Sequence, residues 1–248
     1  MPAKRTSPVE RRPGRQRFLL VVDSSIKSLV YTSTLLQRLQ YNIWTAKNAE
    51  EALEMAGIAV PALIFIADDL DDMPGLELIQ DLKRIEPIRN VPIIILTREH
   101  DREAEMACLA AGAVTCLAMP VKTENLYRVV QVATEPQPRM NIRIHTSLSV
   151  TVDNQTVECI EGECASVLSE HGVYIRTHDP RPLDTKLPVQ IHLAEGTISA
   201  DAVVIYSHQA DKAPLDEPGM GLQFLKISEE DQERIRKFIR AEIMRDIE

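Results

Sequence analysis

Two patterns of apolar and polar positions divide the chain near its middle. In the first part, short apolar runs alternate with segments whose apolar residues recur at helical spacing. Runs that are apolar throughout are typical of parallel strands covered on both faces. The expected strands are Phe18–Val22, Asn42–Ala46, 61–67, 91–97 and 114–118, and the expected helices are 26–39, 49–56, 76–82, 103–111 and 125–132. These strand–helix pairs predict a doubly wound α/β domain with a five-stranded parallel sheet over residues 18–134.

The second pattern begins after a proline-containing joint, Glu135-Pro136-Gln137-Pro138. Beyond the joint, apolar and polar residues alternate, as Leu148, Val150 and Val152 do with the residues between them. Further strand-like runs are 173–175, 189–193, 202–206 and 221–225. Short strands at this spacing predict a small antiparallel β-barrel or sandwich. Ser228, followed by three acidic residues, predicts the start of a closing helix.

The charge of the chain narrows its function classes. The 248 residues carry a net charge of -9 and have a pI of about 5.3, which argues against a nucleic-acid binder because such proteins are usually basic. Residues 1–17 are an exception, with six basic side chains against a single Glu10, and we expect them to form a disordered, solvated tail. No apolar run is long enough to span a membrane and no secretory signal is seen, so we expect a cytoplasmic protein.

The cysteines and histidines predict no metal site and no enzyme. Cys108, Cys116, Cys159 and Cys164 contain no CxxC pair, and we expect reduced, mostly buried thiols. His145, His171 and His192 fall in different segments and lack the spacing of metal ligands. The chain has no nucleophile–histidine–acid set and no Walker loop, so we expect neither catalysis nor a cofactor.

Two arginines and a serine–glycine pair are the candidate ligand-binding residues. Arg139 and Arg143 lie four residues apart at the start of the second part, and Ser169 and Gly172 follow between two strand-like runs. Guanidinium groups are always charged and planar, and they bind both phosphate and the edge of guanine. A serine hydroxyl and the bare backbone of a glycine can contact the same ligand.

Several short motifs in the first part belong together. They are Val21-Val22-Asp23, Asn48-Ala49-Glu50-Glu51-Ala52-Leu53, Gly75-Leu76-Glu77-Leu78, Thr97, Ala111-Gly112-Ala113 and Met119-Pro120. With these motifs, residues 18–134 resemble the receiver domain of bacterial two-component response regulators. In that family an Asp at the end of the third strand accepts a phosphoryl group, with acidic residues that hold Mg²⁺ and a Lys that pairs with the phosphoryl oxygens.

The positions that perform this chemistry are altered. Asp23 matches the first acidic residue of the family, but Ser24 stands where the second acidic residue usually lies. Alignment from both flanks places Ala67 at the phosphoacceptor, and Met119 replaces the Lys before the proline. Only Asp23 and Thr97 keep the residues of the family. We therefore expect a degenerate pseudo-receiver that is not phosphorylated and holds no Mg²⁺.

An acidic loop after the third strand leaves an alternative open. Asp68, Asp69, Asp71 and Asp72 follow Ala67 directly, and a shift of one residue would make Asp68 the acceptor. The loop could also hold a metal beside Asp23. We favour a solvated acidic loop, because the register shift would still leave an uncharged Met in place of the Lys.

The second part carries its own family motifs. They are Arg139-Met140-Asn141-Ile142-Arg143, Val167-Leu168-Ser169-Glu170-His171-Gly172 and Gly219-Met220-Gly221-Leu222-Gln223-Phe224, with the capped helix after them. Residues 136–240 thereby resemble a PilZ domain, a small antiparallel β-barrel with a C-terminal helix that is the bacterial receptor module for cyclic di-GMP. The resemblance implies that Arg139, Arg143, Ser169 and Gly172 bind this dinucleotide.

The PilZ motif also has one altered position. Val167 stands where the family has Asp or Asn, and an apolar side chain cannot accept a hydrogen bond from guanine. The loss of one such bond could cost about 1–3 kcal/mol, or roughly 5- to 150-fold in affinity.

These expectations combine into one functional hypothesis and two alternatives. The chain is expected to have a basic tail (1–17), a receiver-like domain (18–134) and a PilZ domain (135–248), and to bind cyclic di-GMP and relay the signal by protein contact. A ligand-independent scaffold and a response regulator phosphorylated at Asp68 are the alternatives. The protein partner, and whether the chain forms a homodimer, stay open.

Overall fold

The computed structural model describes residues 17–98, 102–153, 155–157, 165–208 and 218–245. The expected tail lies outside the described residues except for Arg17, and so do Cys159 and Cys164. The chain divides into two compact units, Met1–Lys122 and Thr123–Glu248. The joint expected at residues 135–138 follows the last helix of the α/β pattern, and it stays a prediction.

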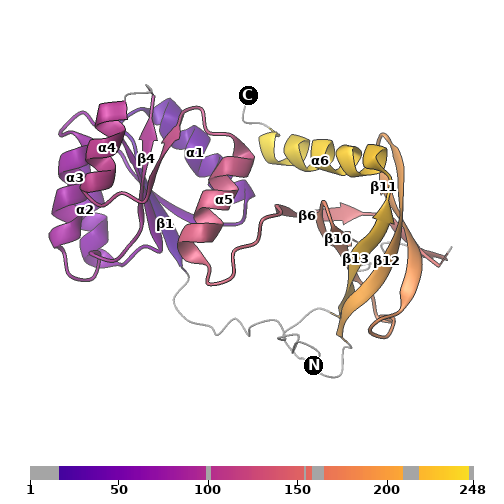
Figure 1. Ribbon diagram of the computed structural model, residues 1–248. Helices are drawn as coiled ribbons and strands as arrows, with labels where there is room; N and C mark the ends of the chain where they lie inside the picture. The colour runs from indigo at the N-terminus through magenta and orange to yellow at the C-terminus, as the bar shows by residue number, and fades with distance from the viewer. Residues whose placement is uncertain (1–16, 99–101, 154, 158–164, 209–217, 246–248) are drawn as a thin grey trace. The chain divides into compact units, whose positions relative to one another are not determined.

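The first unit contains a parallel sheet with helices on both faces (Figure 1). The strand order is β2-β1-β3-β4-β5, and every neighbouring pair is parallel. Its elements are β1 (Phe18–Val22), α1 (Ile26–Arg38), β2 (Asn42–Ala46), α2 (Ala49–Ile58), β3 (Leu63–Ala67), α3 (Gly75–Arg84), β4 (Ile93–Thr97), α4 (Arg102–Ala110) and β5 (Thr115–Ala118). Helix α1 lies on one face of the sheet, and α2, α3 and α4 lie on the other. The predicted doubly wound sheet is confirmed.

The apolar runs explain this core. All five residues of β1 and of β3 are buried, because helices cover the strands on both sides. Polar side chains begin the helices: Ser25 accepts a hydrogen bond from the Ser28 N–H, and Asn48 accepts one from the Glu51 N–H. Gly112 follows α4 with a φ of 109°, a left-handed conformation that suits glycine after a helix. The sheet therefore presents its strand ends on a rigid frame.

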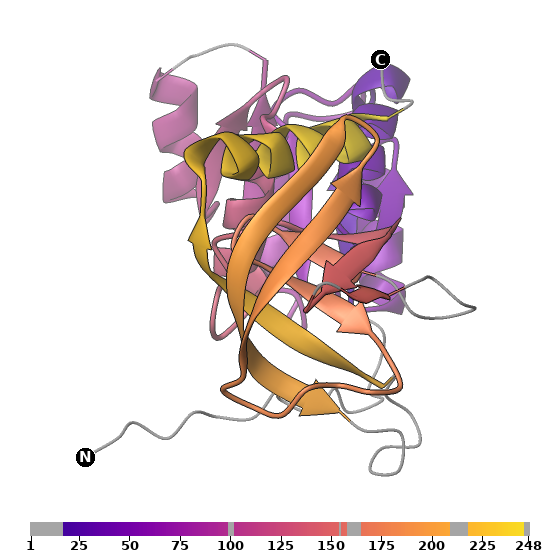
Figure 2. The ribbon, with the colours of Figure 1, turned by 90° about the vertical axis from the view of Figure 1, so that its right-hand side faces the viewer.

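The second unit is a curled antiparallel sheet, a half-barrel, with a helix at its end (Figure 2). The strand order is β6-β9-β10-β13-β12-β11-β7-β8. The elements are α5 (Thr123–Thr134), β6 (Arg143–Leu148), β7 (Val150–Val152), β8 (Gln155–Val157), β9 (Ala165–Ser169), β10 (Gly172–Arg176), β11 (Lys186–Leu193), β12 (Gly196–His208), β13 (Gly219–Ile227) and α6 (Glu229–Met244). Strands β6 and β11 approach each other, which curls the sheet. The predicted small antiparallel barrel with a C-terminal helix is confirmed.

Helix α6 lies across one end of the half-barrel (Figure 2) and contacts β6, β9 and β12. The Ser228 side chain accepts a hydrogen bond from the Asp231 N–H, as the sequence predicts for the helix start. Ile235, Ile239 and Ile243 are buried along one stripe of the helix. The stripe fixes α6 against the strands that carry the candidate ligand-binding residues.

Candidate functional site

Arg143, Ser169 and Gly172 stand in one row across three strands of the half-barrel. Arg143 begins β6 and pairs with Ser169 at the end of β9, and Ser169 pairs with Gly172 at the start of β10. Paired residues on neighbouring strands point to the same face of a sheet. Arg143 is exposed, and the Ser169 hydroxyl donates to the Gly172 carbonyl oxygen at 3.1 Å, so its oxygen lone pairs can still accept. The structure thus brings three of the four predicted residues together.

Gly172 is required for this row on steric grounds. A Cβ at position 172 would collide with the carbonyl oxygen of Leu222 on β13. The family motif therefore has a structural reason here, since only glycine lets β10 and β13 approach this closely.

Arg139 lies in the segment before β6 and is exposed. Its backbone N–H donates to the Gln131 side-chain oxygen at 3.0 Å, so the backbone at this position is held in place. The guanidinium group is on the surface, four residues before Arg143.

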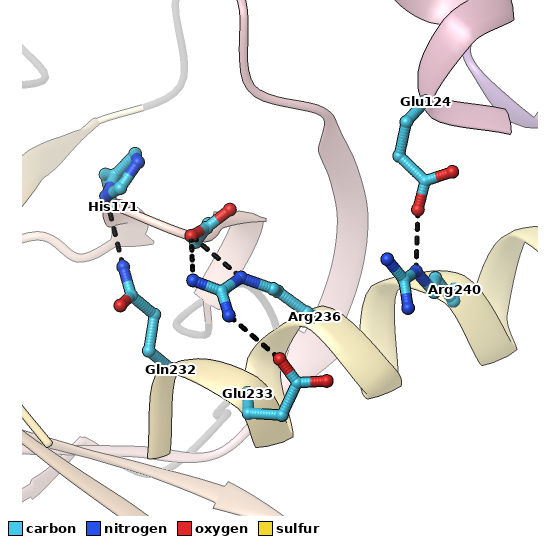
Figure 3. Close-up of polar contacts among 7 residues, drawn as sticks. Glu124, His171, Gln232, Glu233, Arg236 and Arg240 are labelled. Atoms are coloured by element: carbon cyan, nitrogen blue, oxygen red, sulfur yellow. Dashed lines mark hydrogen bonds and ion pairs between the residues drawn. The ribbon is translucent and has the colours of Figure 1, made fainter. Parts of the chain in front are cut away.

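The turn between Ser169 and Gly172 is tied to α6, which the sequence did not predict. Arg236 donates from Nε and Nη2 to Glu170 Oε1 at 2.8 and 2.6 Å, and from Nη1 to Glu233 at 2.8 Å. The Gln232 amide lies 3.5 Å from His171 Nδ1 (Figure 3). Hydrogen bonds to Glu170 and Glu233 raise the pKa of Arg236. The i,i+3 spacing of Glu233 and Arg236 was a visible signal, whereas the contact with Glu170 spans distant segments.

Val167 occupies the second row of the same sheet face. It pairs with His145 on β6 and with Tyr174 on β10, and its side chain is half-buried. The altered motif position is therefore the cross-strand neighbour of Tyr174, and it lies two residues from Ser169 on β9.

In the first unit, the buried carboxylate of Asp23 pairs with an arginine of the same chain. The Asp23 side chain is 2% exposed, and Oδ1 accepts hydrogen bonds from the Ser25 N–H at 2.8 Å and from Arg98 Nη2 at 3.2 Å. Arg98 directly follows β4 and approaches the carboxylate where receiver chemistry would place a cation. Sequence reasoning missed Arg98, because its distance from Asp23 along the chain gives no sign of the contact.

Ser24 also has a role that the motif comparison did not predict. Its hydroxyl donates to the Lys47 carbonyl at 2.9 Å and accepts from the Asp71 N–H at 3.0 Å. A second acidic residue at this position could not make both bonds, because an ionised carboxylate only accepts. Ser24 therefore holds the acidic loop against the end of β1.

The remaining phosphorylation-site positions lie at strand ends. Ala67 is the last residue of β3, is 1% exposed and pairs with Leu96. Asp68 follows it, and its N–H donates to the Leu96 carbonyl. Thr97 ends β4, and its carbonyl accepts from the Met119 N–H at 2.8 Å. The assignment of Ala67 to the acceptor position stays a prediction, and the structure puts an uncharged, buried methyl group at the end of the third strand.

The Asp72 side chain connects the acidic loop to the start of α2. Its two carboxylate oxygens accept from the Ala49 N–H at 3.1 and 2.9 Å, and one also accepts from the Glu50 N–H at 3.2 Å. Burial alone would raise the pKa of Asp72, but these backbone hydrogen bonds hold the pKa below its usual value. The carboxylate therefore stabilises the start of α2, where unpaired N–H groups favour negative charge.

Comparison with known families identifies both parts of the chain. The model of the response regulator receiver domain matches residues 19–131, and that of the PilZ domain matches residues 137–241. The chain therefore contains a receiver domain followed by a PilZ domain. Receiver and PilZ domains are signalling modules that are typically non-catalytic, and a PilZ domain is a cyclic di-GMP-binding module.

Known relatives match about half of this receiver–PilZ chain. The "Two-component response regulator ORR3" of Oryza sativa subsp. indica is 25% identical over 118 residues, 47% of this chain and 90% of the relative. The "Transcriptional regulatory protein ZraR" of Escherichia coli (strain K12) is 27% identical over 115 residues, 46% of this chain and 26% of the relative. The solved chemotaxis response regulator CheY4 of Vibrio cholerae is 29% identical, covers 48% of this chain and 98% of its own, and has a TM-score of 0.45.

The cysteines and histidines of the receiver–PilZ protein form no metal cluster within the described residues. Burial raises the pKa of Cys108, and burial together with nearby Cys108, Glu105 and Asp68 raises the pKa of Cys116 to about 11. Cys108 and Cys116 are free thiols. His192 lies 2.8 Å from the Thr151 hydroxyl and 3.1 Å from that of Thr197.

Among the helices of the described ranges, none is long and apolar enough to cross a membrane.

Proposed function

We propose that this protein is a non-enzymatic cytoplasmic effector that binds cyclic di-GMP on the outer face of its PilZ half-barrel. The observation that carries the proposal is the row Arg143–Ser169–Gly172. An exposed guanidinium beside a hydroxyl and a bare backbone suits a ligand with phosphate groups and guanine edges. The pairing supports the proposal because it brings motif residues from different segments of the chain onto one face of the sheet.

Arg139 supplies the second guanidinium of this proposed site. Its backbone is hydrogen-bonded to Gln131, while the side chain is exposed. An arginine held at the backbone and extended into solvent can fold over an anionic ligand that lies against the strands. Together, Arg139 and Arg143 match the two phosphates of the dinucleotide in charge.

In this proposal, the receiver domain is not phosphorylated and does not receive the signal. Three features support it: Ala67 lacks a nucleophile, Met119 cannot neutralise a phosphoryl group, and Arg98 already pairs with Asp23. A metal ion that binds Oδ1 of Asp23 would compete with the Arg98 guanidinium for this oxygen. The PilZ domain is then the input, and the receiver domain is a surface that passes the signal to a protein partner.

Calorimetry of the full chain with cyclic di-GMP tests the proposal. We expect binding by the wild type and its loss in Arg143→Ala. Arg84→Ala is the matched control, because Arg84 is an exposed arginine of the receiver domain that pairs only with Asp81 among the ion pairs described. Wild-type protein that gives no heat at high micromolar ligand, or an Arg143→Ala variant that binds as the wild type does, would contradict the proposal.

A ligand-independent scaffold is the second candidate, favoured by Val167 and Ala67 together. Each replaces a polar residue that its family uses. The same titration separates the candidates: a scaffold gives no heat with the dinucleotide, yet its capture of a partner protein is unaffected by Arg143→Ala.

A further inference from the structure

The sheet face that carries Arg143 continues into an aromatic surface. Two residues along β6, β9 and β10 from the first row are His145, Val167 and Tyr174, and His145 pairs with Val167 and Val167 with Tyr174. Tyr174 pairs with Gly221, and Gly221 pairs with Tyr206, which follows a bulge in β12. Side chains two apart on a strand point to the same face. The residues between the two rows, among them Ile144, Leu168 and Leu222, are buried on the opposite face. The second row is therefore on the outer face, beside the proposed dinucleotide site.

Tyr174 and Tyr206 form a platform on the glycines of β13. Their ring centroids lie 6.0 Å apart with 24° between the ring planes. A Cβ on Gly221 would collide with the Tyr206 ring, and one on Gly219 would lie 2.7 Å from the Tyr174 hydroxyl oxygen. The rings thus lie down against the bare backbone of β13, and both side chains stay half-buried with part of their surface open to solvent.

The surroundings of the platform suit an anionic, base-bearing ligand. His208 is next to Tyr206, with ring centroids 6.1 Å apart, and Arg176 pairs with Gly219 in the third row of the same face. None of the residues in these rows is acidic, although the chain as a whole has a net charge of -9. Rows that carry arginine and histidine and no acidic side chain favour the approach of a phosphate-containing ligand.

Val167 and Tyr174 together indicate how the ligand contact has changed. Val167 cannot make the hydrogen bond of the family motif, and its strand neighbour on the ligand side is a tyrosine. Aromatic rings bind bases by stacking, whatever the hydrogen-bonding edge. An apolar residue beside a ring surface is compatible with a base lying flat over both.

We propose that Tyr174 and Tyr206 form a stacking platform for a guanine base of the bound dinucleotide, in place of the hydrogen bond lost at Val167. This inference rests on the proposed function and adds a subsite to it. Arg143 and Ser169 hold the phosphate-bearing part in the first row, and the platform holds a base in the second row.

Full-length variants with and without the ring surface test the platform by calorimetry. Tyr174→Leu and Tyr206→Leu are expected to raise the Kd for cyclic di-GMP by roughly 5- to 150-fold, the equivalent of about 1–3 kcal/mol. Tyr174→Phe keeps the ring and is the matched control, with a Kd near the wild-type value. In the wild type, the NMR signal of a guanine H8 proton should move upfield on binding, because a base over a ring lies in its shielding region.

The outcomes separate the platform from the proposed function. Binding that is lost in Arg143→Ala but unchanged in both leucine variants, with no upfield shift of H8 in the wild type, overturns the platform and leaves the dinucleotide site intact. No binding by the wild type overturns both. The H8 measurement needs only wild-type protein, so a leucine variant that fails to fold does not remove the test.

Discussion

Glu170 and Arg236 join the turn between Ser169 and Gly172 to the C-terminal helix of the PilZ domain. One carboxylate oxygen of Glu170 accepts from two nitrogens of the Arg236 guanidinium, at 2.8 and 2.6 Å. Glu170 stands between Ser169 and Gly172, and Arg236 lies in the middle of α6. A shift of the turn on ligand binding would therefore change its contact with α6.

The first prediction concerns this pair. Arg236→Met should lower the melting temperature and weaken cyclic di-GMP binding, because Glu170 loses its two donors and the turn loses its contact with α6. Lys237→Met is the matched control on an exposed position of the same helix. Thermal unfolding and calorimetry check both effects. A lower melting temperature with unchanged affinity would mean that the pair stabilises the fold without contributing to the ligand site.

Val167→Asn should restore the missing acceptor of the PilZ motif. Val167 is half-buried on the outer face, so an amide there can reach both solvent and ligand. We expect the Kd for cyclic di-GMP to fall, by at most roughly 5- to 150-fold, if a full hydrogen bond is regained. Calorimetry measures the change, and Val167→Ala controls for the loss of apolar surface. Equal or weaker binding by the asparagine variant would count against a guanine edge at this position.

The receiver domain should be inert to phosphoryl donors. With Mg²⁺ and either acetyl phosphate or beryllofluoride, we expect unchanged backbone NMR signals. The reasons are that Ala67 has no nucleophile and that Asp23 already forms an ion pair with Arg98. A variant with Ala67→Asp, Met119→Lys and Arg98→Ala is the positive control, since it regains the acceptor and the Lys and frees Asp23 for a metal. An acid-labile phosphoryl group mapped to Asp68 in the wild type would establish the other register.

Asp72 predicts a pH-dependent part of the stability. The pKa of Asp72 is lowered in the folded state, so its stabilisation is present above the unfolded pKa of about 3.9 and is lost as the pH falls through the lower folded pKa. Asp72→Asn should destabilise the protein by about 0.5–1 kcal/mol at neutral pH, a small effect because the group is exposed and screened.

Urea unfolding of Asp72→Asn and wild type from pH 7 down to about pH 3 follows this difference. The two proteins should converge at the acid end. Asp71→Asn, which changes an exposed carboxylate of the same loop, is the control and should stay close to the wild type at every pH. A constant difference between Asp72→Asn and wild type across the range would contradict the assignment.

Strands that are apolar throughout were predicted well. β1 matches the expected range and β3 differs only at its start, because covered parallel strands must be apolar at every position. β2 also matches the expected range, although its pattern is mixed and partly exposed. For β6 and β9 the sequence indicated strand-like runs after Arg143 and before Ser169, but it gave no bounds for either strand. β6 contains exposed His145 and Ser147 on its outer face, so its pattern is mostly polar, and Arg143 belongs to the strand instead of preceding it.

The site was predicted in part for a similar reason. Arg143, Ser169 and Gly172 were visible because their spacing is local to short motifs, and the register then placed them in one row. Tyr174 and Tyr206, and Arg98 with Asp23, are far apart in sequence, and no periodicity links them.

The amino-acid sequence by itself determined the two domains, their order, the capped helix α6 and the altered positions Ala67, Met119 and Val167. These depend on local patterns and on the identity of single residues, which a chain displays without being folded. Only the tertiary structure decided which residues surround the altered positions: Arg98 at Asp23, Ser24 in the acidic loop and the tyrosine pair beside Val167. Strand pairing and strand-end loops create these contacts, and both join positions that are distant along the chain.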